Sequence, residues 1–567
     1  MHYRFEKEGI YMKKNSFVEG SLIATFAIIF TKILGMLYVI PFYSIIGSQG
    51  SALYSYAYNI YMIFLSISSA GIPTAMSKIV SEYESKELRD AKVRTFKIGI
   101  LIIGLLSIIC FIVLLFFSEN IAKLIVGDIS NGGNSLQDIT MVIFVISFAV
   151  LIIPFLSVAR GYLQGHKYIK PSSDSQMLEQ IVRIIVILAG SYTAIKLLKL
   201  NISYGVAVAV SGAFFGGLAA IFYILKKIID NKTELSLGIE LKKDKVTNKE
   251  ILKKIVYYSL PFIIINITVN IYNTVDMSLI IRTLSKIGYN GADSEFIAGV
   301  VTTWGYKLNM IVNAIATGLT ISLIPNIVSS YTTGKHKEVN RIFNKALQIV
   351  LFVSIPAATG LSFLATPVWV SFYGPSHYGP IVFRFTILTA IFCNVYLIAI
   401  QTAQSLNKYK SVYIAVIGGT LLNACLDVPM MYLCNKLGIY PFYGATISTI
   451  IGYLFSITFV LFTIKRMKDI NYKSTWNTLF KLLLSLVAML IVLSILKIFV
   501  PLTITNRIKS ILQIALYAVV GAITYFIITY KLGIINELFG QNMINKVFKI
   551  ITFGKYKGAK NDANKEN

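Results

Sequence analysis

The stretch KIGILIIGLLSIICFIVLLFF, residues 97–117, decides the fold class of this chain. It carries a single charge, at Lys97, and it is apolar on every side rather than on alternate residues. A helix needs about 20 apolar residues to cross the hydrocarbon of a bilayer, so this run predicts a membrane-spanning helix. A strand of a membrane barrel is excluded, because such strands are about ten residues long and alternate in polarity.

Comparable apolar runs follow one another along nearly the whole chain of 567 residues. Hydrophobic residues make up 56% and charged residues 14%, where a soluble protein carries about 25% charged residues. With only four cysteines the chain is also no disulfide scaffold. The sequence predicts an all-α polytopic membrane protein with fourteen spans, near 17–40, 51–73, 97–117, 139–159, 177–196, 203–225, 255–281, 297–325, 346–370, 381–405, 412–433, 442–464, 478–500 and 510–530.

The distribution of Lys and Arg predicts the orientation of these spans. With an inside N-terminus, and with Lys97 and Lys196 counted with their adjoining loops, the inner segments hold 39 of the 53 basic residues and the outer loops hold 8. Cytoplasmic loops are enriched in Lys and Arg, so both termini are predicted to be cytoplasmic. The net charge of +27 then reflects the orientation of the chain in the membrane, and we expect no nucleic-acid partner. No cleaved signal peptide is evident, and Met12 offers an alternative start of translation.

Short motifs recur in the two halves of the chain. Residues 79–83 (IVSEY) resemble 327–331 (IVSSY), residues 204–206 (YGV) resemble 443–445 (YGA), and a Lys-Tyr pair follows the fourth span of each half. Parallel repeats of six spans are typical of transporters with the substrate path between the halves. The predicted parts are a cytoplasmic tail (1–16), an N-lobe (17–230), a cytoplasmic linker (231–254), a C-lobe (255–465), two further helices (478–530) and a basic cytoplasmic tail (531–567).

Motifs for catalysis are missing from the sequence. There is no G-x-x-x-x-G-K-[ST] loop for phosphate and no H-E-x-x-H zinc motif, and the four cysteines and four histidines lack metal-ligand spacing. We therefore expect no catalytic residues, no metal and no cofactor, and a transporter rather than an enzyme.

Charges inside predicted spans are costly and mark candidate functional sites. Lys307 lies near the middle of the eighth span, too deep to reach the surface, whereas Arg282 and Arg384 lie close enough to the outer interface to reach it. Glu179 and Arg183 are four residues apart and share a helix face. The candidates for a substrate cavity are Lys32, Lys307, Arg183, Glu179, Arg282, Arg384, Tyr54, Tyr58 and Asn59, and those for a coupling ion are Asp276 and Asp427. An aromatic belt at the outer interface is the alternative explanation for Tyr54 and Tyr58.

Residues 31–35 (TKILG), 40–43 (IPFY), 71–73 (GIP), 81–83 (SEY) and 161–165 (GYLQG) resemble the stage V sporulation protein B group. The stretch from Pro171 through Glu179 to Arg183 also matches the fifth helix of that group. The group belongs to the multidrug/oligosaccharidyl-lipid/polysaccharide exporter superfamily and is related to lipid II flippases of the MurJ type. The resemblance extends over about twelve spans.

This resemblance implies two six-helix lobes around a cavity that opens alternately to each side, with the last two helices forming a groove for a lipid tail. It implies that Lys32 and Lys307 match the arginines that receive a pyrophosphate on helices one and eight of lipid II flippases. The second span of this chain carries no basic residue, and Lys lacks the bidentate fork of Arg.

The sequence thus predicts a monomeric flippase of the cytoplasmic membrane for an undecaprenyl-pyrophosphate-linked glycan, with lipid II as the first candidate. Membrane lipids and cell-wall synthesis enzymes are the expected partners. No nucleotide motif is present, so an ion gradient of H⁺ or Na⁺, or the membrane potential, would supply the energy. Two alternatives stay open: a cation-coupled drug exporter of the same superfamily, and a non-transporting scaffold of a cell-wall synthesis complex.

Overall fold

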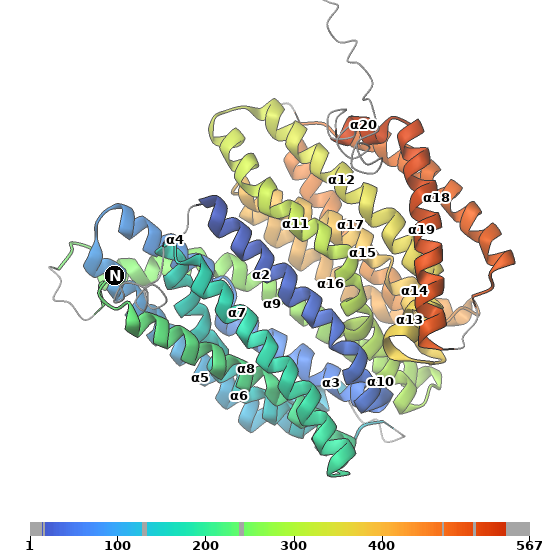
Figure 1. The fold of residues 1–567 in the computed structure, drawn as a ribbon, viewed down its shortest axis with the longest axis horizontal. Coiled ribbons are helices and arrows are strands. Elements are labelled where there is room, and N and C mark those ends of the chain that lie inside the picture. The colour runs from blue at the N-terminus through green and yellow to red at the C-terminus, as the bar shows by residue number, and fades with distance from the viewer. Residues whose placement is uncertain are drawn as a thin grey trace, which may run out of the picture. The chain divides into compact units, whose positions relative to one another are not determined.

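The computed structural model describes Lys14 and residues 17–126, 133–237, 243–467, 470–502 and 506–539. Within these ranges the chain is helical, with short connections and no strand (Figure 1). The helices are α2 (Phe17–Leu37), α3 (Val39–Ser69), α4 (Ile72–Ser85), α5 (Arg89–Val126), α6 (Leu136–Gly165), α7 (Ile169–Ile185), α8 (Ile202–Asp230), α9 (Asn248–Ile287), α10 (Gly291–Gly299), α11 (Gly305–Thr332), α12 (His336–Phe363), α13 (Ala365–Tyr373), α14 (Tyr378–Thr386), α15 (Thr389–Ser405), α16 (Tyr409–Lys436), α17 (Phe442–Lys465), α18 (Lys473–Phe499), α19 (Arg507–Lys531) and α20 (Ile534–Phe539).

Twelve helical segments among the described residues are long and apolar enough to cross a membrane. They coincide with twelve of the fourteen predicted spans, which confirms a multi-pass membrane protein. The other two predictions, 17–40 and 297–325, fall on α2 and on the stretch through α10 and α11. These segments are helical but are not among the twelve, so the count of fourteen stays a prediction.

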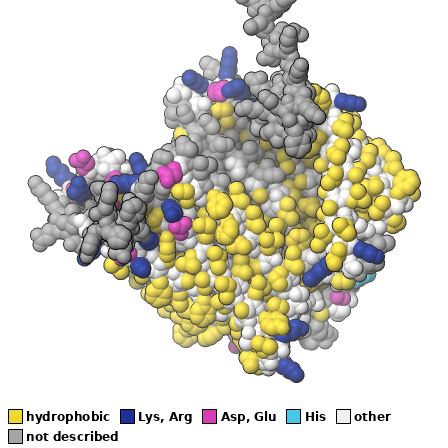
Figure 2. Space-filling model, viewed as in Figure 1, with side chains coloured by type: hydrophobic (Ala, Val, Ile, Leu, Met, Phe, Trp, Pro, Cys, Tyr) yellow, Lys and Arg dark blue, Asp and Glu magenta, His cyan; other side chains and the backbone are white. Residues whose placement is uncertain are grey.

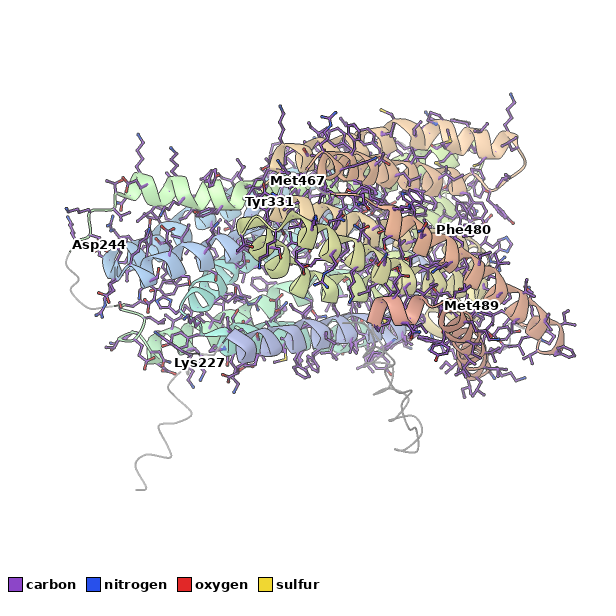
Figure 3. The ribbon with its side chains drawn as sticks, turned by 90° about the horizontal axis from the view of Figure 1, so that it is seen from above. Lys227, Asp244, Tyr331, Met467, Phe480 and Met489 are labelled. Carbon is purple, nitrogen blue, oxygen red and sulfur yellow. The ribbon has the colours of Figure 1, made fainter. Side chains whose placement is uncertain are left out.

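Large apolar side chains stand exposed along the helices, as a protein immersed in lipid requires. Leu101, Phe116 and Phe222 are each more than 60% exposed on the faces of α5 and α8. Figure 2 shows hydrophobic side chains over much of the visible described surface, and many Lys and Arg gather where α4 ends and α5 and α9 begin. In Figure 3, Lys227 and Asp244 lie at that same end.

The helices group into two compact units, which are described separately. Unit 1 comprises Met1–Met310, Phe372–Thr386 and Tyr413–Ser456. Unit 2 comprises Ile311–Ser371, Ile387–Val412 and Ile457–Asn567. None of the boundaries between the two units falls in the predicted linker 231–254, and the arrangement of two six-helix lobes stays a prediction.

The core of unit 1 packs α4 against α6 with α5, α8 and α9 around them. Ile79, Val80 and Tyr83, from the repeated motif IVSEY, are fully buried there. Gly161 and Gly165 of α6 permit the close approach, because a Cβ at either position would lie within 3 Å of atoms of α4. The motif that the sequence singled out as a repeat is therefore a packing surface.

Residues 41–50 differ from the sequence prediction, which placed a loop between the first two spans there. They are helical and form the start of α3. Pro41 is tolerated because it lies in the first turn, where the backbone N–H groups have no partner within the helix. Gly47 kinks the helix with a φ of 66°, which a residue without a Cβ adopts at little cost.

Unit 2 is built on α12, which packs against α15 and α18, and α18 in turn packs against α19. Three amide side chains of α12 hold the beginning of α18. Asn344 Nδ2 donates to the Asn471 carbonyl at 2.8 Å, Asn340 Oδ1 accepts from the Asn471 N–H at 3.2 Å, and Gln348 Nε2 donates to Ser474 Oγ at 2.7 Å. The first turn of α18 is thereby fixed in position.

Candidate functional site

Lys307 of α11 is 7% exposed in unit 1 and is enclosed by aromatic rings. Its Nζ lies 4.4 Å from the ring centre of Trp304, 4.8 Å from that of Tyr54 and 5.8 Å from that of Tyr58. It also donates a hydrogen bond of 3.0 Å to the hydroxyl of Tyr38. Lys307 forms no ion pair with any residue in the described part of the chain. A desolvated cation is thus held by ring faces and one hydroxyl.

The aromatic cage is built from several elements of unit 1. Tyr38 is the single residue between α2 and α3, and its hydroxyl lies 3.3 Å from that of Tyr54. Trp304 closes a π-helical turn (Val300–Trp304) directly before α11, and its Nε1 donates to the Ser51 carbonyl at 3.0 Å. The hydroxyl of Tyr373 donates to the Trp304 carbonyl at 2.8 Å. This turn interrupts the α-helix three residues before Lys307.

A second cationic cluster lies at α7. Glu179 accepts from Arg183 at 2.5 Å, as the sequence spacing predicts, and it also pairs with Arg160 of α6 at 3.0 Å. Two arginines share one carboxylate, so the cluster carries a net charge of +1. Arg183 also lines a small cavity of about 30 Å³ together with Tyr54, Tyr58 and Tyr61 of α3.

Tyr54 and Tyr58 therefore lie between Lys307 and the cavity that Arg183 lines. Lys307 lies over their rings, and Arg183 lines the same small cavity as they do. Tyr54 is 6% exposed and Tyr58 is half-buried, so these rings face the interior of the unit rather than forming a belt toward lipid. Arg183 supplies the positive charge beside α3 that the second predicted span itself lacks.

The remaining cavity candidates lie elsewhere in unit 1. Asn59 is buried and donates to Met277 Sδ at 3.2 Å and to Thr302 Oγ1 at 3.3 Å. Arg282 is exposed and donates to the carbonyl of Leu124 in the last turn of α5, where a cation stabilises a helix end. Arg384 is exposed in the last turn of α14. Lys32 is half-buried on α2, and its expected role beside Lys307 in receiving a pyrophosphate stays a prediction.

The two ion-coupling candidates meet inside unit 1. Asp276 of α9 and Asp427 of α16 are buried neighbours. Asn423 donates to Asp276 at 2.5 Å, and the Ser448 hydroxyl of α17 donates to Asp427. Asp427 Oδ2 and Asn423 Oδ1 are buried with no hydrogen-bond donor among the described residues. Two carboxylates, an amide oxygen and a hydroxyl are hard oxygen donors, which suit Na⁺ or a shared proton.

Several residues of these sites escaped the sequence analysis. Tyr38 was placed within a span without a role, and Arg160 lay just beyond the predicted end of the fourth span. Trp304 stands three residues before Lys307, which puts it on the same helix face, and that spacing was a usable signal. Asn423 stands four residues before Asp427, and this spacing was a usable signal in the same way. Asn423, Ser448 and Arg160 gain their partners from other helices, which no local pattern reveals.

Unit 2 contains an apolar groove between α12, α18 and α19. Its cavity volume is about 370 Å³, and its wall is almost wholly apolar. Tyr525 closes one part of it by donating to the Phe352 carbonyl at 2.9 Å. Other lining residues include Gly360, Met489, Leu493, Tyr517 and Gly521. The groove lies beside the last two long helices, and its use by a lipid tail stays a prediction.

Comparisons with known proteins agree with the resemblance seen in the sequence. The model of the family described as polysaccharide biosynthesis protein matches residues 17–330. The lipid II flippase MurJ of Bacillus subtilis (strain 168) is 29% identical over 542 residues, covering 93% of this chain and 97% of that protein. Stage V sporulation protein B of the same organism is 29% identical over 213 residues, covering 38% of this chain and 39% of that protein.

Among solved structures, the lipid II flippase MurJ in an inward closed conformation shares the fold. Its TM-score is 0.65 at 18% identity, with 91% of this chain and 99% of that chain covered. The family model matches more than half of the sequence, and the matched residues include the buried motif IVSEY of α4. The chain therefore belongs to the polysaccharide biosynthesis protein family.

Proposed function

We propose that this protein is a flippase that moves a lipid-linked glycan across the cytoplasmic membrane, with lipid II as the first substrate candidate. Three features support the proposal. Lys307 is enclosed by aromatic rings in unit 1, and the Glu179 cluster with its two arginines lies near the same tyrosines. An apolar groove lies beside the last two long helices. The named function of the B. subtilis relative, which is covered over 97% of its length, also supports the proposal.

The observation that carries the proposal is the environment of Lys307. A cation in the membrane interior costs a few kcal/mol on insertion scales, so it is retained for a function. Aromatic faces and one hydroxyl hold the ammonium group without neutralising its charge. A pyrophosphate entering this site would exchange ring contacts for charge-assisted hydrogen bonds, which are stronger in a low-dielectric site. Tyr54 and Tyr58 are then available to stack against a sugar.

The first test replaces Lys307 in the full-length protein reconstituted into liposomes with a fluorescent lipid-linked glycan. We expect Lys307→Ala to slow flipping by about tenfold or more, which corresponds to about 1.4 kcal/mol of lost headgroup stabilisation. Lys307→Arg keeps the charge and should retain most activity. Lys436→Ala, at the exposed end of α16, is the matched control. An alanine variant that flips at the wild-type rate would exclude the pyrophosphate role.

We further propose that the Asp276–Asp427 pair binds the coupling ion, H⁺ or Na⁺. A single cation or proton shared by the pair would relieve the repulsion between two buried carboxylates and satisfy the oxygens that lack a donor. The loaded and empty states then differ by one charge in the core formed by α9, α16 and α17. Such a difference can bias which side of the membrane the cavity opens to.

This proposal is tested by flipping rates at varied Na⁺ and varied pH. Asp276→Asn and Asp427→Asn should each remove the ion dependence, because the amide cannot exchange a charge. Asp293→Asn, on the nearby helix α10, is the control and should keep the dependence. If the flipping rate of the wild type depends on neither Na⁺ nor pH, the Asp276–Asp427 pair does not bind a coupling ion and has only a structural role.

The scaffold alternative and the substrate are tested together in living cells. Expression of this protein in place of an essential lipid II flippase should restore growth. Growth that depends on Lys307 supports transport of lipid II, and rescue by Lys307→Ala would favour a scaffold. If there is no rescue but a related lipid-linked polysaccharide is flipped in liposomes, the substrate is a different glycan.

A further inference from the structure

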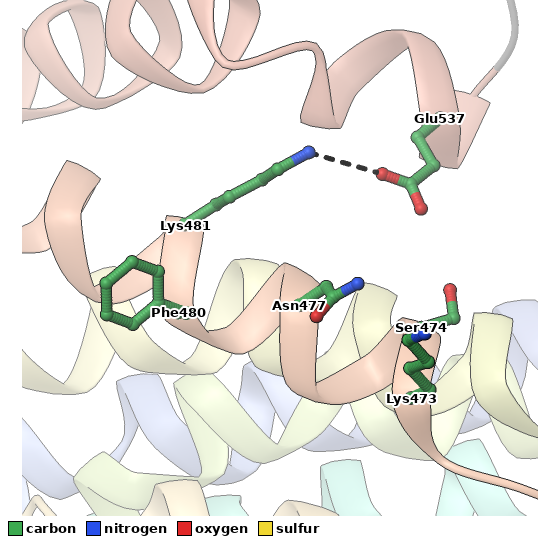
Figure 4. Close-up of a pocket in the computed structure, with 6 residues that line it drawn as sticks. All are labelled: Lys473, Ser474, Asn477, Phe480, Lys481 and Glu537. Carbon is green, nitrogen blue, oxygen red and sulfur yellow. Dashed lines mark ion pairs between the residues drawn. The ribbon is translucent and has the colours of Figure 1, made fainter.

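A polar pocket in unit 2 is separate from both candidate sites and from the apolar groove. Its cavity volume is about 530 Å³, and α18 and α20 line it (Figure 4). The lining residues are Lys473, Ser474, Asn477, Phe480, Lys481 and Glu537. It thus combines two ammonium groups, a hydroxyl and an amide with a single carboxylate, beside an aromatic ring.

The spacing along α18 brings the donors of this pocket together. Lys473, Asn477 and Lys481 are four residues apart in succession, so they lie on one face of the helix. Ser474 accepts a hydrogen bond of 2.7 Å from Gln348, which is 5% exposed, and keeps its own proton to donate. The amide side chains of α12 fix the backbone of this first turn and the position of Ser474.

The ion pair in the pocket is loose. Lys481 Nζ lies 4.0 Å from Glu537 Oε2, and the two side chains are 39% and 44% exposed. Figure 4 shows both side chains reaching toward each other across the space between α18 and α20. An exposed pair at this distance contributes little free energy, so Lys481 can turn to a stronger anionic ligand without a large loss.

The next face of α18 is apolar and exposed. Phe480, Leu484, Val487 and Ile491 are between 49% and 66% exposed and form a stripe that leads away from the pocket along the helix. Trp476 is 67% exposed at the beginning of this stripe, where an aromatic ring is favoured at the boundary between headgroups and hydrocarbon. Figure 3 shows Phe480 and Met489 in succession along α18. A pocket beside such a ring and such a stripe is expected at the membrane surface, where the stripe offers a path for acyl chains.

We propose that this pocket binds the headgroup of an anionic bilayer phospholipid, with its phosphodiester between Lys473 and Lys481 and its acyl chains along the exposed stripe. The two lysines and Glu537 sum to +1, which matches the single charge of a phosphodiester such as that of phosphatidylglycerol. Ser474 and Asn477 offer hydrogen bonds to the headgroup hydroxyls. In the predicted topology this end of α18 faces the cytoplasm, so the ligand is an inner-leaflet lipid.

The experiment measures lipid binding to the purified full-length protein in detergent by native mass spectrometry. We expect phosphatidylglycerol to bind more tightly than zwitterionic phosphatidylethanolamine. The double variant Lys473→Ala/Lys481→Ala should lower the affinity for phosphatidylglycerol by about tenfold or more, since each basic residue near an anionic surface contributes about fivefold. Glu537→Gln should raise that affinity, because it removes the repulsive charge.

The matched control is Lys335→Ala/Lys337→Ala, which removes two exposed lysines before and at the start of α12 and should leave binding unchanged. Equal binding of the two lipids, or unchanged binding by the Lys473/Lys481 variant, would refute the site. Displacement of the lipid by inorganic phosphate at equal concentration would show a free phosphate site instead. Tighter binding of a polyprenyl pyrophosphate than of phosphatidylglycerol, abolished by the same variant, would assign the pocket to the transported lipid. The assay involves no flipping, so its result is independent of the proposed function.

Discussion

At the scale of single residues, the protein manages buried charge in three different ways. Lys307 is stabilised by aromatic rings, Glu179 by two arginines, and Asp276 by an amide beside a second carboxyl group. Each environment leaves a different chemistry available: an exchangeable cation, a fixed cluster of net charge +1, and an oxygen-rich site. In this chain the partners of a buried charge, and not only its presence in a span, determine what chemistry it can offer.

Glu295 of α10 is a further buried carboxyl group, outside the predicted spans. It is 1% exposed and accepts hydrogen bonds from the backbone N–H of Asn134 at 3.0 Å and from its side-chain amide at 2.7 Å. There is no room for a Cβ at Gly133 beside it. Burial raises the pKa of Glu295 to about 7, and the hydrogen bonds from Asn134 offset this only in part.

This raised pKa predicts a pH dependence of stability. The folded protein holds a proton on Glu295 that the unfolded chain releases near pH 4.5, so the stabilisation is complete below that pH and is lost as the pH rises through about 7. Glu295→Gln, which cannot ionise, should therefore gain melting temperature relative to wild type between pH 5 and pH 7.5. Asp293→Asn on the same helix is the control. A constant difference between wild type and Glu295→Gln across this range would contradict the prediction.

At the scale of helices, glycine residues determine where two helices approach closely and where a space between them stays open. Gly419 of α16 and Gly452 of α17 bring two backbones together, since a Cβ on either would lie 2.7 Å from the carbonyl oxygen of the other. Gly360 of α12 is the opposite case, because nothing lies within 4 Å of where its Cβ would be. It lines the apolar groove of unit 2, so its missing side chain contributes to the volume of that groove.

Filling this groove tests its use in transport. Gly360→Leu should place a branched side chain in the groove without a clash and strongly reduce flipping of a long-chain lipid substrate. The fold should be unaffected or gain up to about 1 kcal/mol, because leucine favours a helix over glycine. Gly318→Leu on α11 also projects into open space but does not line the groove, and it should flip normally. Wild-type flipping by Gly360→Leu would show that the lipid tail lies elsewhere.

At the scale of the whole molecule, the charge distribution predicts how the protein is inserted. The side chains at the junction of α4, α5 and α9 are rich in Lys and Arg, and this end contains predicted inner segments (Figure 2). Pairs such as Lys254–Glu82 at 2.8 Å and Lys92–Glu84 at 2.6 Å also lie there. Basic clusters of this kind are retained on the cytoplasmic side.

Single-cysteine labelling in intact cells tests this orientation. In a background from which all four native cysteines have been removed, Lys436→Cys should react with a membrane-impermeant maleimide, because it lies in a predicted outer loop. Lys245→Cys, in the predicted inner linker, should react only after the membrane is permeabilised. The reverse pattern would invert the predicted topology.

Much of the fold follows from local composition. Apolar runs of about 20 residues determine where helices cross the membrane, because unpaired backbone groups are too costly in hydrocarbon for any other open structure. Residues 41–50 were mispredicted as a loop because hydropathy does not mark them as part of a span; they form the start of α3, which is kinked at Gly47 by its positive φ. Glu179–Arg183 was predicted correctly because both partners lie on one helix four residues apart.

The candidate sites were decided by tertiary structure. The sequence alone determined that Lys307, Asp276 and Asp427 are buried charges in need of partners, because a charge in an apolar span cannot be left unsolvated at low cost. Only the fold supplied those partners: Tyr38 and Trp304 around Lys307, Arg160 beside Glu179, and Asn423 and Ser448 beside the two aspartates. Except for Trp304, which lies three residues from Lys307, these partners come from other helices or, for Tyr38, from the residue between α2 and α3. Their formation depends on crossing geometry and on close approaches at glycine, which no pattern along one helix encodes.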